Sequence, residues 1–384
     1  KKVLVIGGGP AGCSAVHQLH STEKYNITLV EKSNILGAGL RTNFFGGHPY
    51  TFGPRHFLTH KQKVYDYLNN IVPLKDCSHH EFLTYVESDN SFYNFPIHMD
   101  DVRSMPDSDL ILKEIKEAKG HQAASNLEEF WIGSVGIRLY EKLVKDYNKK
   151  MWMIDDNKKI DTFNWSPKGI VINDGPKAAL PGYLSAYPIA RNGYDDYFDQ
   201  VYKKCKVCKN IKDLKFDIKN KKVFFNNENH QFDIIINTIS PDILFNQHYG
   251  ELKFIGRDFH KIVFPTEYVF PKNVFFLYYA NDEKFTRLVE YKKFTNHKSP
   301  TSLIGMEIPS LDGKHYPLPI KSEQELASKY HNEMPEGVFS IGRAGSYRYL
   351  VDFDDCIDQS MELIDILDSS SYDHPVPIKR WREI

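Results

Sequence analysis

A glycine-rich turn between an apolar strand and a helix is the feature of this sequence that most constrains its fold. The apolar run Val3–Gly7 is typical of a buried parallel strand. Apolar residues then recur at helical spacing up to Leu19, and a second apolar strand, Ile27–Val30, ends at Glu31. This order predicts the first βαβ unit of a doubly wound α/β fold. The glycines of the G-x-G-x-x-G pattern in the turn are Gly7, Gly9 and Gly12.

Each of these residues has a physical role in binding a dinucleotide. Gly7 permits a tight turn, Gly9 lets a pyrophosphate approach the backbone, and Gly12 lets the helix pack closely on the strand. The positive end of the helix dipole attracts the pyrophosphate. Glu31 lies 19 residues after Gly12, where a carboxylate accepts hydrogen bonds from a ribose diol and disfavours a 2′-phosphate. The alternative interpretation is a tight turn that packs the helix on the sheet without a ligand.

The pattern by itself does not distinguish FAD from NAD. Its place at the N-terminus favours FAD, because the start of the chain resembles flavoproteins of the glutathione-reductase type. We therefore expect an α/β fold with a discontinuous FAD-binding Rossmann-like domain, an inserted helical domain and an antiparallel β-sheet domain. The expected boundaries are residues 1–74 plus 335–384 for the first domain, with further middle segments, 75–165 for the helical substrate domain and 190–334 for the mainly antiparallel domain.

The periodicity of the remaining sequence gives a coarse map of helices and strands. A helix is expected at Lys61–Asn70, residues 75–150 are expected to be mostly helical with a capping box at Ser125–Glu128, and Gly169–Asn192 is expected to be a long loop. One helical stripe is predicted to comprise Ile137, Tyr140, Val144, Tyr147 and Met151. Strands are predicted at Val223–Phe225, Phe232–Ile236, Lys261–Phe264, Val274–Ala280, Arg287–Tyr291, Ser302–Ile308 and Val338–Gly342, before a helix that starts near Asp354.

Composition limits the partners that we expect. The chain has 49 basic and 50 acidic side chains and a formal net charge of -1, so no excess of positive charge attracts nucleic acid or an acidic membrane. The longest apolar runs have about seven residues, whereas a membrane-spanning helix needs about 20. We therefore expect no nucleic-acid partner and no membrane insertion. The first residues already form a strand, so we expect no secretory leader.

The cysteines favour a reducing compartment. Their number, 5, is odd in a chain without a visible leader, which predicts reduced thiols in the cytoplasm. Cys205 and Cys208 form a lone C-x-x-C, and a zinc ribbon would need a second pair, so we expect no metal site. A redox role for this pair remains the alternative to a structural or incidental one.

Short segments beyond the turn carry a more specific signal through their order. They are FGPRHFLT at Phe52–Thr59, NFPIHM at Asn94–Met99, NLEE at Asn126–Glu129, DYNKKMW at Asp146–Trp152, FTR at Phe285–Arg287, HYP at His315–Pro317, and Gly342-Arg343 followed by Tyr347 and Tyr349. Arg257 lies 30 residues before Arg287. In order and spacing these segments resemble UDP-galactopyranose mutases, flavoenzymes that interconvert the pyranose and furanose forms of a nucleotide sugar.

The resemblance implies a specific chemistry. N5 of reduced FAD attacks the anomeric carbon of the sugar and displaces the nucleotide diphosphate, and the resulting flavin–sugar adduct opens and recloses through another hydroxyl. No net redox change occurs, so an external reductant, NAD(P)H or reduced flavin, only primes the enzyme. The implied substrate is UDP-galactose or a substituted relative such as UDP-N-acetylgalactosamine, and a homodimer is expected by analogy.

The resemblance also assigns roles to individual residues. Arg287 would bind the departing diphosphate, unless it only forms a salt bridge with Glu290. Arg343 would lie near the flavin or the diphosphate. Tyr147 would stack on the uracil and Trp152 would line the sugar pocket, although both residues could instead be core. Further substrate contacts are expected from Arg257, Tyr316 and Tyr349, and further cofactor contacts from Gly39 and Gly342.

Departures from the family pattern gather around the expected sugar position. Arg55 replaces a histidine beside the flavin and sugar, His56 stands at an isoleucine position, and Leu58 replaces a second histidine. We predict that Arg55 recognises an added acceptor on the sugar, unless a protein carboxylate pairs with it. Val351 replaces an acid, with Asp352 one place late. The loop that supplies a second diphosphate arginine in the family contains none here, which leaves Lys168 or Arg191 as the replacement.

Two other functions remain open from the sequence. A redox flavoenzyme related to amine oxidases would share the glycine-rich turn and the general fold. A flavin- or sugar-nucleotide-binding protein without activity would account for Val351 and for the missing loop arginine.

Overall fold

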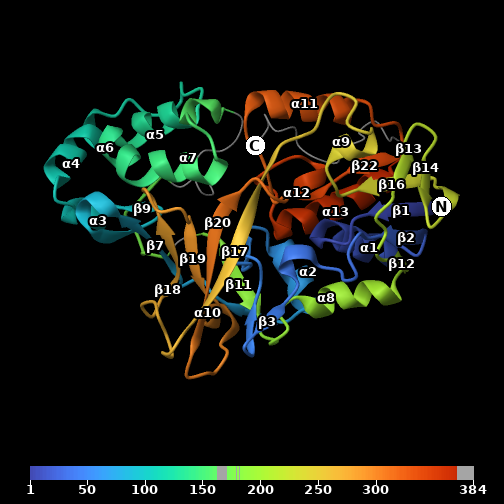
Figure 1. The fold of residues 1–384 in the computed structure, drawn as a ribbon, viewed down its shortest axis with the longest axis horizontal. Coiled ribbons are helices and arrows are strands. Elements are labelled where there is room, and N and C mark those ends of the chain that lie inside the picture. Colours follow the sequence, from blue (N-terminus) through green and yellow to red (C-terminus); the bar gives the residue numbers. More distant parts are fainter. Residues whose placement is uncertain (162–170, 179, 181, 370–384) are drawn as a thin grey trace.

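The computed structural model describes residues 1–161, 171–178, 180 and 182–369. A parallel sheet with its covering helices occupies the side of the molecule that carries the N-terminus (Figure 1). A large, mostly antiparallel sheet crosses the middle, and a group of helices lies beyond it. The site described below lies where these three parts meet.

The parallel sheet explains why the first strand is apolar throughout. Val3 and Val5 pack in the core on one face, whereas Leu4 and Ile6 pack in a second core on the other face. The predicted strand–turn–helix order is confirmed, with helix α1 at Pro10–Ser21. The strands, in their order across the sheet, are β12 (Lys206–Cys208), β2 (Asn26–Val30), β1 (Lys2–Ile6), β16 (Ile234–Asn237) and β22 (Val338–Ser340).

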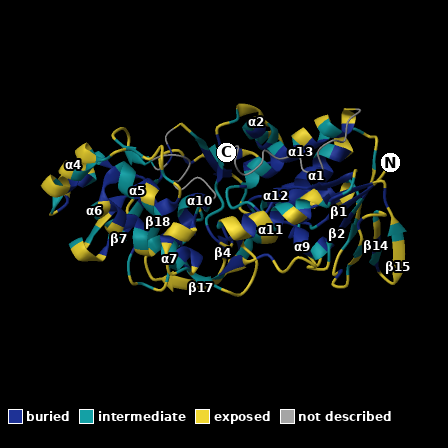
Figure 2. Ribbon diagram, turned by 90° about the horizontal axis from the view of Figure 1, so that it is seen from above, coloured by how far each residue is buried: buried dark blue, intermediate teal, exposed yellow. Residues whose placement is uncertain are grey.

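Each face of this sheet has its own cover. Helix α1 packs beside α13 (Phe353–Asp368) on one face. Apolar residues of a small antiparallel sheet pack against the other face. Figure 2 shows buried residues running through β1 and α12 (Gly342–Gly345), with exposed residues on β15 at the rim. The small sheet consists of β13 (Lys215–Asp217), β14 (Lys222–Phe225) and β15 (Glu228–Gln231).

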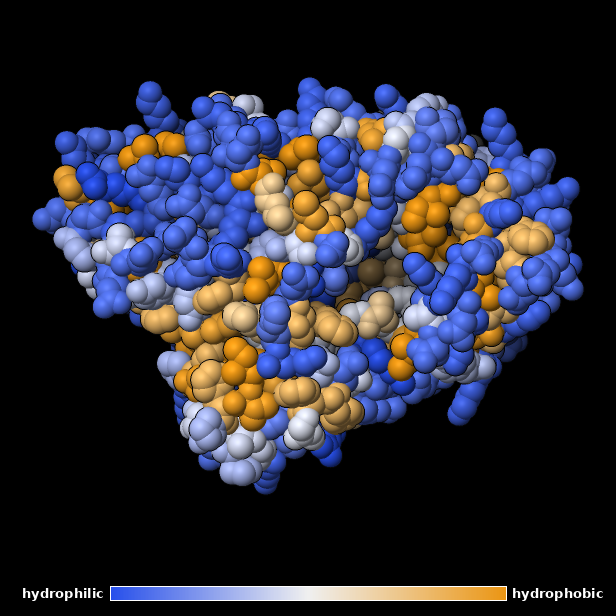
Figure 3. All heavy atoms as spheres, in the orientation of Figure 1, coloured by the Kyte–Doolittle hydropathy of each residue, from blue (hydrophilic) through white to orange (hydrophobic). Residues whose placement is uncertain are grey.

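The large sheet brings distant parts of the chain side by side. All its neighbouring strands pair antiparallel except β7 and β18, which are parallel. Figure 3 shows apolar side chains gathered over its lower part, where Ile262, Val263 and Phe264 are exposed. Its strands, in order, are β21 (Tyr316–Pro317), β17 (Phe254–Phe264), β20 (Ser302–Ser310), β19 (Arg287–Glu290), β18 (Val274–Tyr279), β7 (Glu81–Val86) and β8 (Ser91–Asn94).

The prediction that residues 75–150 are mostly helical is wrong for their first part. Strands β6 (Leu74–Asp76), β7, β8 and β9 (Ile97–His98) precede the first helix of this region. In β7 the burial alternates, with Phe82, Thr84 and Val86 buried, which is the period of a half-buried strand. The long-loop interpretation of residues 169–192 is also wrong at β11 (Leu184–Pro188), which pairs between β5 (Phe57–Thr59) and β6. The domain boundaries themselves remain a prediction.

A π-helical turn lies within the predicted helical stripe. Glu141–Lys145 has π-helical hydrogen bonding between α6 (Ile137–Tyr140) and α7 (Asp146–Trp152). Because a π turn adds a residue, the side chains after it are rotated relative to those before it. Tyr140, Val144 and Met151 of the stripe are nevertheless buried in one core, and only its first residue, Ile137, is exposed, at 48%. The neighbouring helix α5 (Leu127–Val135) is capped by Asn126 rather than by the predicted Ser125, with Glu129 accepting from Ser125 in return.

The remaining elements connect these parts. Within the described residues no helix is both long and apolar enough to cross a membrane. The other helices are α2 (Gln62–Ile71), α3 (Met99–Ser104), α4 (Ser108–Glu117), α8 (Asp195–Asp199), α9 (Pro241–Leu244), α10 (Tyr291–Thr295) and α11 (Lys321–Asn332). Short 3-10 helices lie at Ala38–Leu40, Glu87–Asp89, Asn157–Lys159 and Gln200–Lys203, and short strands at β3 (Asn43–Phe45), β4 (His48–Tyr50) and β10 (Ile172–Asn173).

Candidate functional site

A cavity of about 790 Å³ lies between the glycine-rich turn, the large sheet and helix α7. The surface is hollowed near the middle of the view in Figure 3, between the two sheet regions. Most of the predicted site residues line this one cavity, although they come from segments far apart in sequence. They are Gly9, Gly39, Arg55, Tyr147, Trp152, Arg257, Arg287, Tyr316, Gly342, Arg343 and Tyr349.

The glycine-rich turn leaves room for a pyrophosphate. A Cβ atom on Gly9 would find only the Ala38 Cβ nearby, at 3.6 Å, so this position is open toward the cavity. At Gly12, by contrast, a Cβ atom would lie 1.9 Å from the carbonyl oxygen of Gly7. Gly7 itself has a φ of 98°, which favours glycine. Within the described residues no side chain caps the N-terminus of α1. The turn therefore fits a dinucleotide cofactor.

Glu31 lies at the carboxyl end of β2, and hydrogen bonds fix its carboxylate. The backbone N–H of Gly8 donates to Oε2 at 2.6 Å, and that of Ser33 donates to Oε1 at 2.7 Å. Each oxygen keeps a second lone pair, so the carboxylate can still accept from a ribose. Glu31, Gly7 and Gly12 do not line the large cavity itself.

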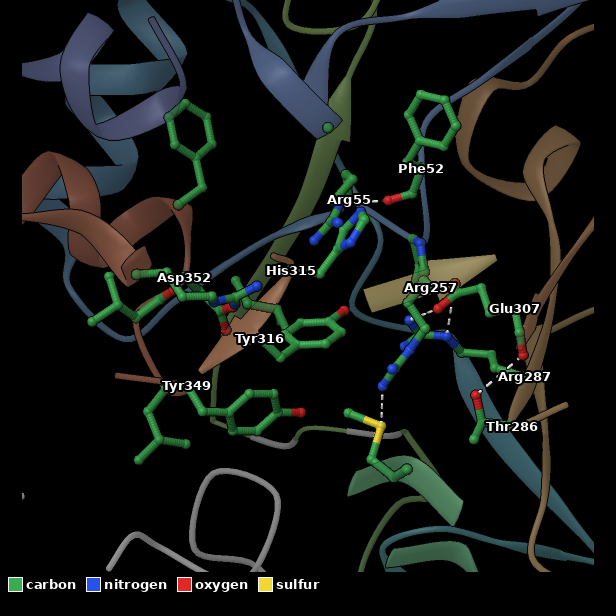
Figure 4. Close-up of a pocket in the computed structure, with 18 of the residues that line it drawn as sticks. Phe52, Arg55, Arg257, Thr286, Arg287, Glu307, His315, Tyr316, Tyr349 and Asp352 are labelled. Atoms are coloured by element: carbon green, nitrogen blue, oxygen red, sulfur yellow. Dashed lines mark hydrogen bonds and ion pairs between the residues drawn. The ribbon is translucent and has the colours of Figure 1, made fainter. Parts of the chain in front are cut away.

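The register of the large sheet places a row of polar side chains along one wall of the cavity. Tyr278 on β18 is opposite Arg287 on β19, and Arg287 is opposite Glu307 on β20. Directly opposite residues of neighbouring strands share a face of the sheet. All three side chains line the cavity, and Figure 4 shows Arg287 directed toward Glu307.

Glu307, not Glu290, is the partner of Arg287. Arg287 donates from Nη2 to Oε2 of Glu307 at 2.7 Å and from Nε to Oε1 at 3.1 Å. Burial alone would raise the pKa of the Glu307 carboxyl, but the charge and hydrogen bonds of Arg287, with Arg257 and Arg55 nearby, hold it below its usual value. The alternative of a salt bridge to Glu290 is therefore wrong. Glu290 is buried and accepts hydrogen bonds from Val269, Phe270 and Ser302 instead.

Arg343 is held at the opposite wall. Its Nε donates to the Val351 carbonyl oxygen at 3.0 Å, and its Nη2 donates to the carboxylate of Asp352. The guanidinium carbon lies 5.1 Å from the centre of the Tyr316 ring. Asp352, which stands one residue after the position of the family's acid, is thus the carboxylate that pairs with Arg343.

Arg55 and Arg257 carry positive charge without a carboxylate partner within 4.0 Å among the described residues. Arg55 donates from Nε to the Phe52 carbonyl oxygen at 2.8 Å, which leaves its two terminal nitrogens available. Arg257 donates to the Gly256 carbonyl oxygen and to the Met151 sulfur, and its guanidinium carbon lies 4.8 Å from the centre of the Tyr316 ring. Both residues are half-buried, and a positive charge that faces a cavity favours an anion or several acceptors, so these two groups suit an anionic ligand.

Aromatic side chains form the rest of the lining. The rings of Trp152 and Tyr349 meet edge to face with their centres 4.8 Å apart, and those of Tyr349 and Tyr316 with their centres 5.4 Å apart. Burial would raise the pKa of Tyr316, but Arg55, Arg287 and Arg257 outweigh it and lower the pKa from its ordinary value. Burial, with Tyr316 beside it, raises the pKa of Tyr349 to about 12. Tyr147 is half-buried and faces Tyr278.

Other predicted residues have different positions. Lys168 lies outside the described residues. Arg191 does not line the cavity; it donates to the Gly47 carbonyl oxygen and lies over the Phe44 ring. His56 and Leu58, the two other departures beside Arg55, do line it.

The C-x-x-C pair has no feature of a redox centre. Both cysteines are free, and only Cys208 lies within strand β12. Burial, with Cys208 nearby, raises the pKa of Cys205 to about 12. A reactive cysteine needs a lowered pKa, so the structural interpretation is favoured.

Sequence reasoning missed Glu307 and His315 as cavity residues. Glu307 stands alone in the apolar stretch Ser302–Ser310, and a lone acid in a buried strand needs a positive partner, so this signal was available. His315 belongs to the segment His315–Pro317, but the sequence pattern predicts no role for it. Burial, together with the charges of Arg55 and Arg257, lowers the pKa of His315.

Two family models match this chain, and solved structures share its fold. A family model described as UDP-galactopyranose mutase matches residues 142–349, more than half of the chain. A model described as an NAD(P)-binding Rossmann-like domain matches residues 5–71. A crystal structure of reduced UDP-galactopyranose mutase is 17% identical, with 97% of this chain and 96% of that chain covered and a TM-score of 0.77.

Proteins named as oxidases share the fold. A putative protoporphyrinogen oxidase from Exiguobacterium sp. is 12% identical, with 96% of this chain and 98% of that chain covered and a TM-score of 0.69. Putrescine oxidase bound to putrescine is 12% identical, with 96% and 99% covered and a TM-score of 0.54. At these identities the likeness establishes the fold alone.

Proposed function

The chain belongs to the UDP-galactopyranose mutase family, and on that premise we propose that it is an isomerase that interconverts the pyranose and furanose forms of a UDP-sugar. The substrate in this proposal is UDP-galactose or a substituted relative such as UDP-N-acetylgalactosamine. The cofactor is FAD in its reduced form, bound through Gly7, Gly9, Gly12 and Glu31. The observation that carries the proposal is the convergence of Arg257, Arg287, Tyr316 and Tyr349 on the cavity that the glycine-rich turn also lines.

In this proposal the protein binds and orients while the cofactor supplies the covalent chemistry. Reduced flavin, when bound, supplies a nucleophile for the anomeric carbon. Arg287 holds the diphosphate, whose charge increases as it departs. Arg257 is the second arginine of the diphosphate site, since its charge has no carboxylate partner among the described residues. Tyr147 stacks on the uracil, and Trp152 borders the sugar.

The net charge of the lining supports an anionic substrate. The Arg287 and Arg343 charges are balanced by Glu307 and Asp352. Lys314 also lines the cavity and pairs with Glu251, so Arg55 and Arg257 remain against the one further carboxylate of the lining among the described residues, Asp354. A diphosphate supplies the matching negative charge, whereas an apolar amine substrate does not. This favours the mutase over an amine-oxidase-like activity.

The direct test uses the purified, yellow protein. We expect it to isomerise UDP-galactose or UDP-N-acetylgalactosamine after reduction with dithionite, and not in its oxidised state. Chromatography that separates pyranose from furanose forms measures the product. Stoichiometric consumption of an electron acceptor with oxidation of the sugar or an amine would instead indicate a redox enzyme. Absence of isomerisation by the reduced protein with both substrates would contradict the proposal.

Arg55 is the residue that we propose sets the preferred sugar. Replacing Arg55 by histidine should shift the ratio of kcat/KM values away from UDP-N-acetylgalactosamine and toward UDP-galactose. A charge-assisted hydrogen bond contributes roughly 1.5–3 kcal/mol, so the ratio should change by about 10- to 150-fold. Arg191→His is the matched control, because Arg191 lies outside the cavity. A ratio that stays the same in Arg55→His would remove the specificity role.

We propose further that an external reductant primes the enzyme and that the chain forms a homodimer that acts in the cytoplasm. In this proposal the enzyme makes the furanose form of galactose available for cell-surface polysaccharide synthesis. The reductant, the homodimer and the polysaccharide role are supported by the family resemblance, and the cytoplasmic location by the odd number of cysteines.

A further inference from the structure

Lys150 is a partly buried lysine that does not line the cavity and has no place in the function proposed above. Its side chain is 14% exposed and reaches from helix α7 to the turn between β18 and β19. There Nζ donates to three carbonyl oxygens: Tyr279 at 3.0 Å, Asn281 at 3.1 Å and Glu283 at 2.6 Å. An ammonium group has three donors, so this turn uses all of them.

The two elements that Lys150 joins carry adjoining parts of the cavity wall. Helix α7 presents Tyr147, Met151 and Trp152 to the cavity. The turn continues at one end from Tyr278 and leads at the other end to Arg287, and both residues line the cavity. The Tyr147 and Tyr278 rings meet with their centres 5.8 Å apart. Lys150 therefore lies behind the junction between the proposed uracil site and the proposed diphosphate site.

A smaller or uncharged side chain at position 150 could not donate three charge-assisted hydrogen bonds to this turn. Burial lowers the pKa of Lys150 to about 8, and the Glu283 carboxylate, 3.8 Å away, opposes that shift. Without the ammonium group the three carbonyl oxygens would each lose a charge-assisted hydrogen bond. The turn has another attachment, because Oδ1 of Asn281 accepts from the Glu87 backbone at 2.8 Å. Loss of Lys150 should therefore loosen the turn relative to α7 without unfolding the sheet.

We infer that Lys150 is a positioning residue that fixes the distance between the base-binding helix and the diphosphate-binding strand, an inference that rests on the proposed function. A ligand that occupies both parts at once depends on that distance. A ligand that occupies only one part does not, because each part keeps its own side chains. Lys150 thus determines how well UDP fits as a whole, although it touches no part of it.

The experiment compares three probes by isothermal titration on the flavin-loaded protein: UDP, uridine and pyrophosphate. In Lys150→Met the Kd for UDP should rise by about tenfold, because the base site and the diphosphate site are no longer held at the right distance. This is the size of effect expected for the loss of one charge-assisted hydrogen bond. The Kd values for uridine and pyrophosphate should change less than about twofold. Lys149→Met is the matched control, because it removes the same charge from the same helix and, among the described residues, Lys149 forms no hydrogen bond or ion pair with the turn. Amide exchange at residues 279–286 should be faster in Lys150→Met alone.

Each other outcome overturns the inference. Equal losses of affinity for UDP, uridine and pyrophosphate would mean that Lys150 acts on the base site and on the diphosphate site separately. An unchanged affinity for UDP would show that Lys150 has no positioning role. Loss of flavin or of cooperative unfolding in both Lys150→Met and the milder Lys150→Gln would make Lys150 a general structural residue. Failure of the wild-type protein to bind UDP at all would instead refute the proposed function, so the two failures are distinguishable.

Discussion

Replacing Gly9 by valine should strip the flavin from the protein and leave the fold intact. Gly9 has a φ of -76° and a ψ of -173°, which any residue adopts, and a Cβ atom there meets only the Ala38 Cβ at 3.6 Å. The chain itself therefore accepts a side chain at this position. A bound pyrophosphate does not, because the methyl groups of valine would occupy the space that it needs. We expect the affinity for FAD to fall by at least about a hundredfold, equivalent to about 2.7 kcal/mol.

The visible absorbance of the purified protein measures this effect, and circular dichroism and thermal unfolding check the fold. Gly9→Val should unfold like the flavin-free wild-type protein, because bound flavin stabilises the folded state by mass action. Gly12→Val is the contrasting variant. Its Cβ atom would lie 1.9 Å from the Gly7 carbonyl oxygen, so it should lose the fold as well as the flavin. A Gly9→Val protein that stays fully yellow would show that the turn holds no pyrophosphate.

Removing Arg287 should abolish most of the turnover and also destabilise the protein. Loss of a group that stabilises developing charge lowers turnover by about 100-fold or more. Glu307 is 3% exposed, and Arg287→Ala would leave its carboxylate buried without its bidentate partner. Breaking a buried pair in this way costs about 3–5 kcal/mol. A loss of activity in the single variant is therefore not by itself evidence of a catalytic role.

The double variant Arg287→Ala, Glu307→Gln separates the two effects. A neutral amide at position 307 removes the buried charge, so thermal unfolding should return toward that of the wild-type protein. Turnover should stay low, since no group replaces the guanidinium at the diphosphate, and flavin content should be unchanged. Chromatographic turnover, flavin absorbance and thermal unfolding on the three proteins provide the measurements. Recovery of turnover together with stability would assign Arg287 a purely structural role.

The sequence by itself determined the nucleotide-binding end of the molecule. The turn from Gly7 to Gly12 is encoded by neighbouring residues, so its conformation depends on local backbone sterics and on the strand and helix that flank it. The fully apolar first strand follows from burial on both faces of a parallel sheet. The order of the short motifs indicated the family without any knowledge of their contacts.

The period of a strand would also have excluded one predicted pair. Arg287 and Glu290 are separated by three residues on β19, and successive side chains on a strand alternate between its faces. They therefore lie on opposite faces, and only a residue from another strand can reach Arg287. That this residue is Glu307 depends on the register between β19 and β20, which no local pattern specifies.

Tertiary structure alone decided the remaining features of the site. The π-helical turn before α7 rotates Tyr147 and Met151 relative to Ile137, and the sequence periodicity contains no sign of it. The charge state of the cavity depends on which arginines have a carboxylate within reach: Arg287 and Arg343 do, whereas Arg55 does not among the described residues. The paired residues are 20 and 9 positions apart in the sequence, on different strands or on either side of a turn. These pairings are fixed only when the sheets and helices pack, because the distance between two charges, and not their presence in the sequence, sets their interaction.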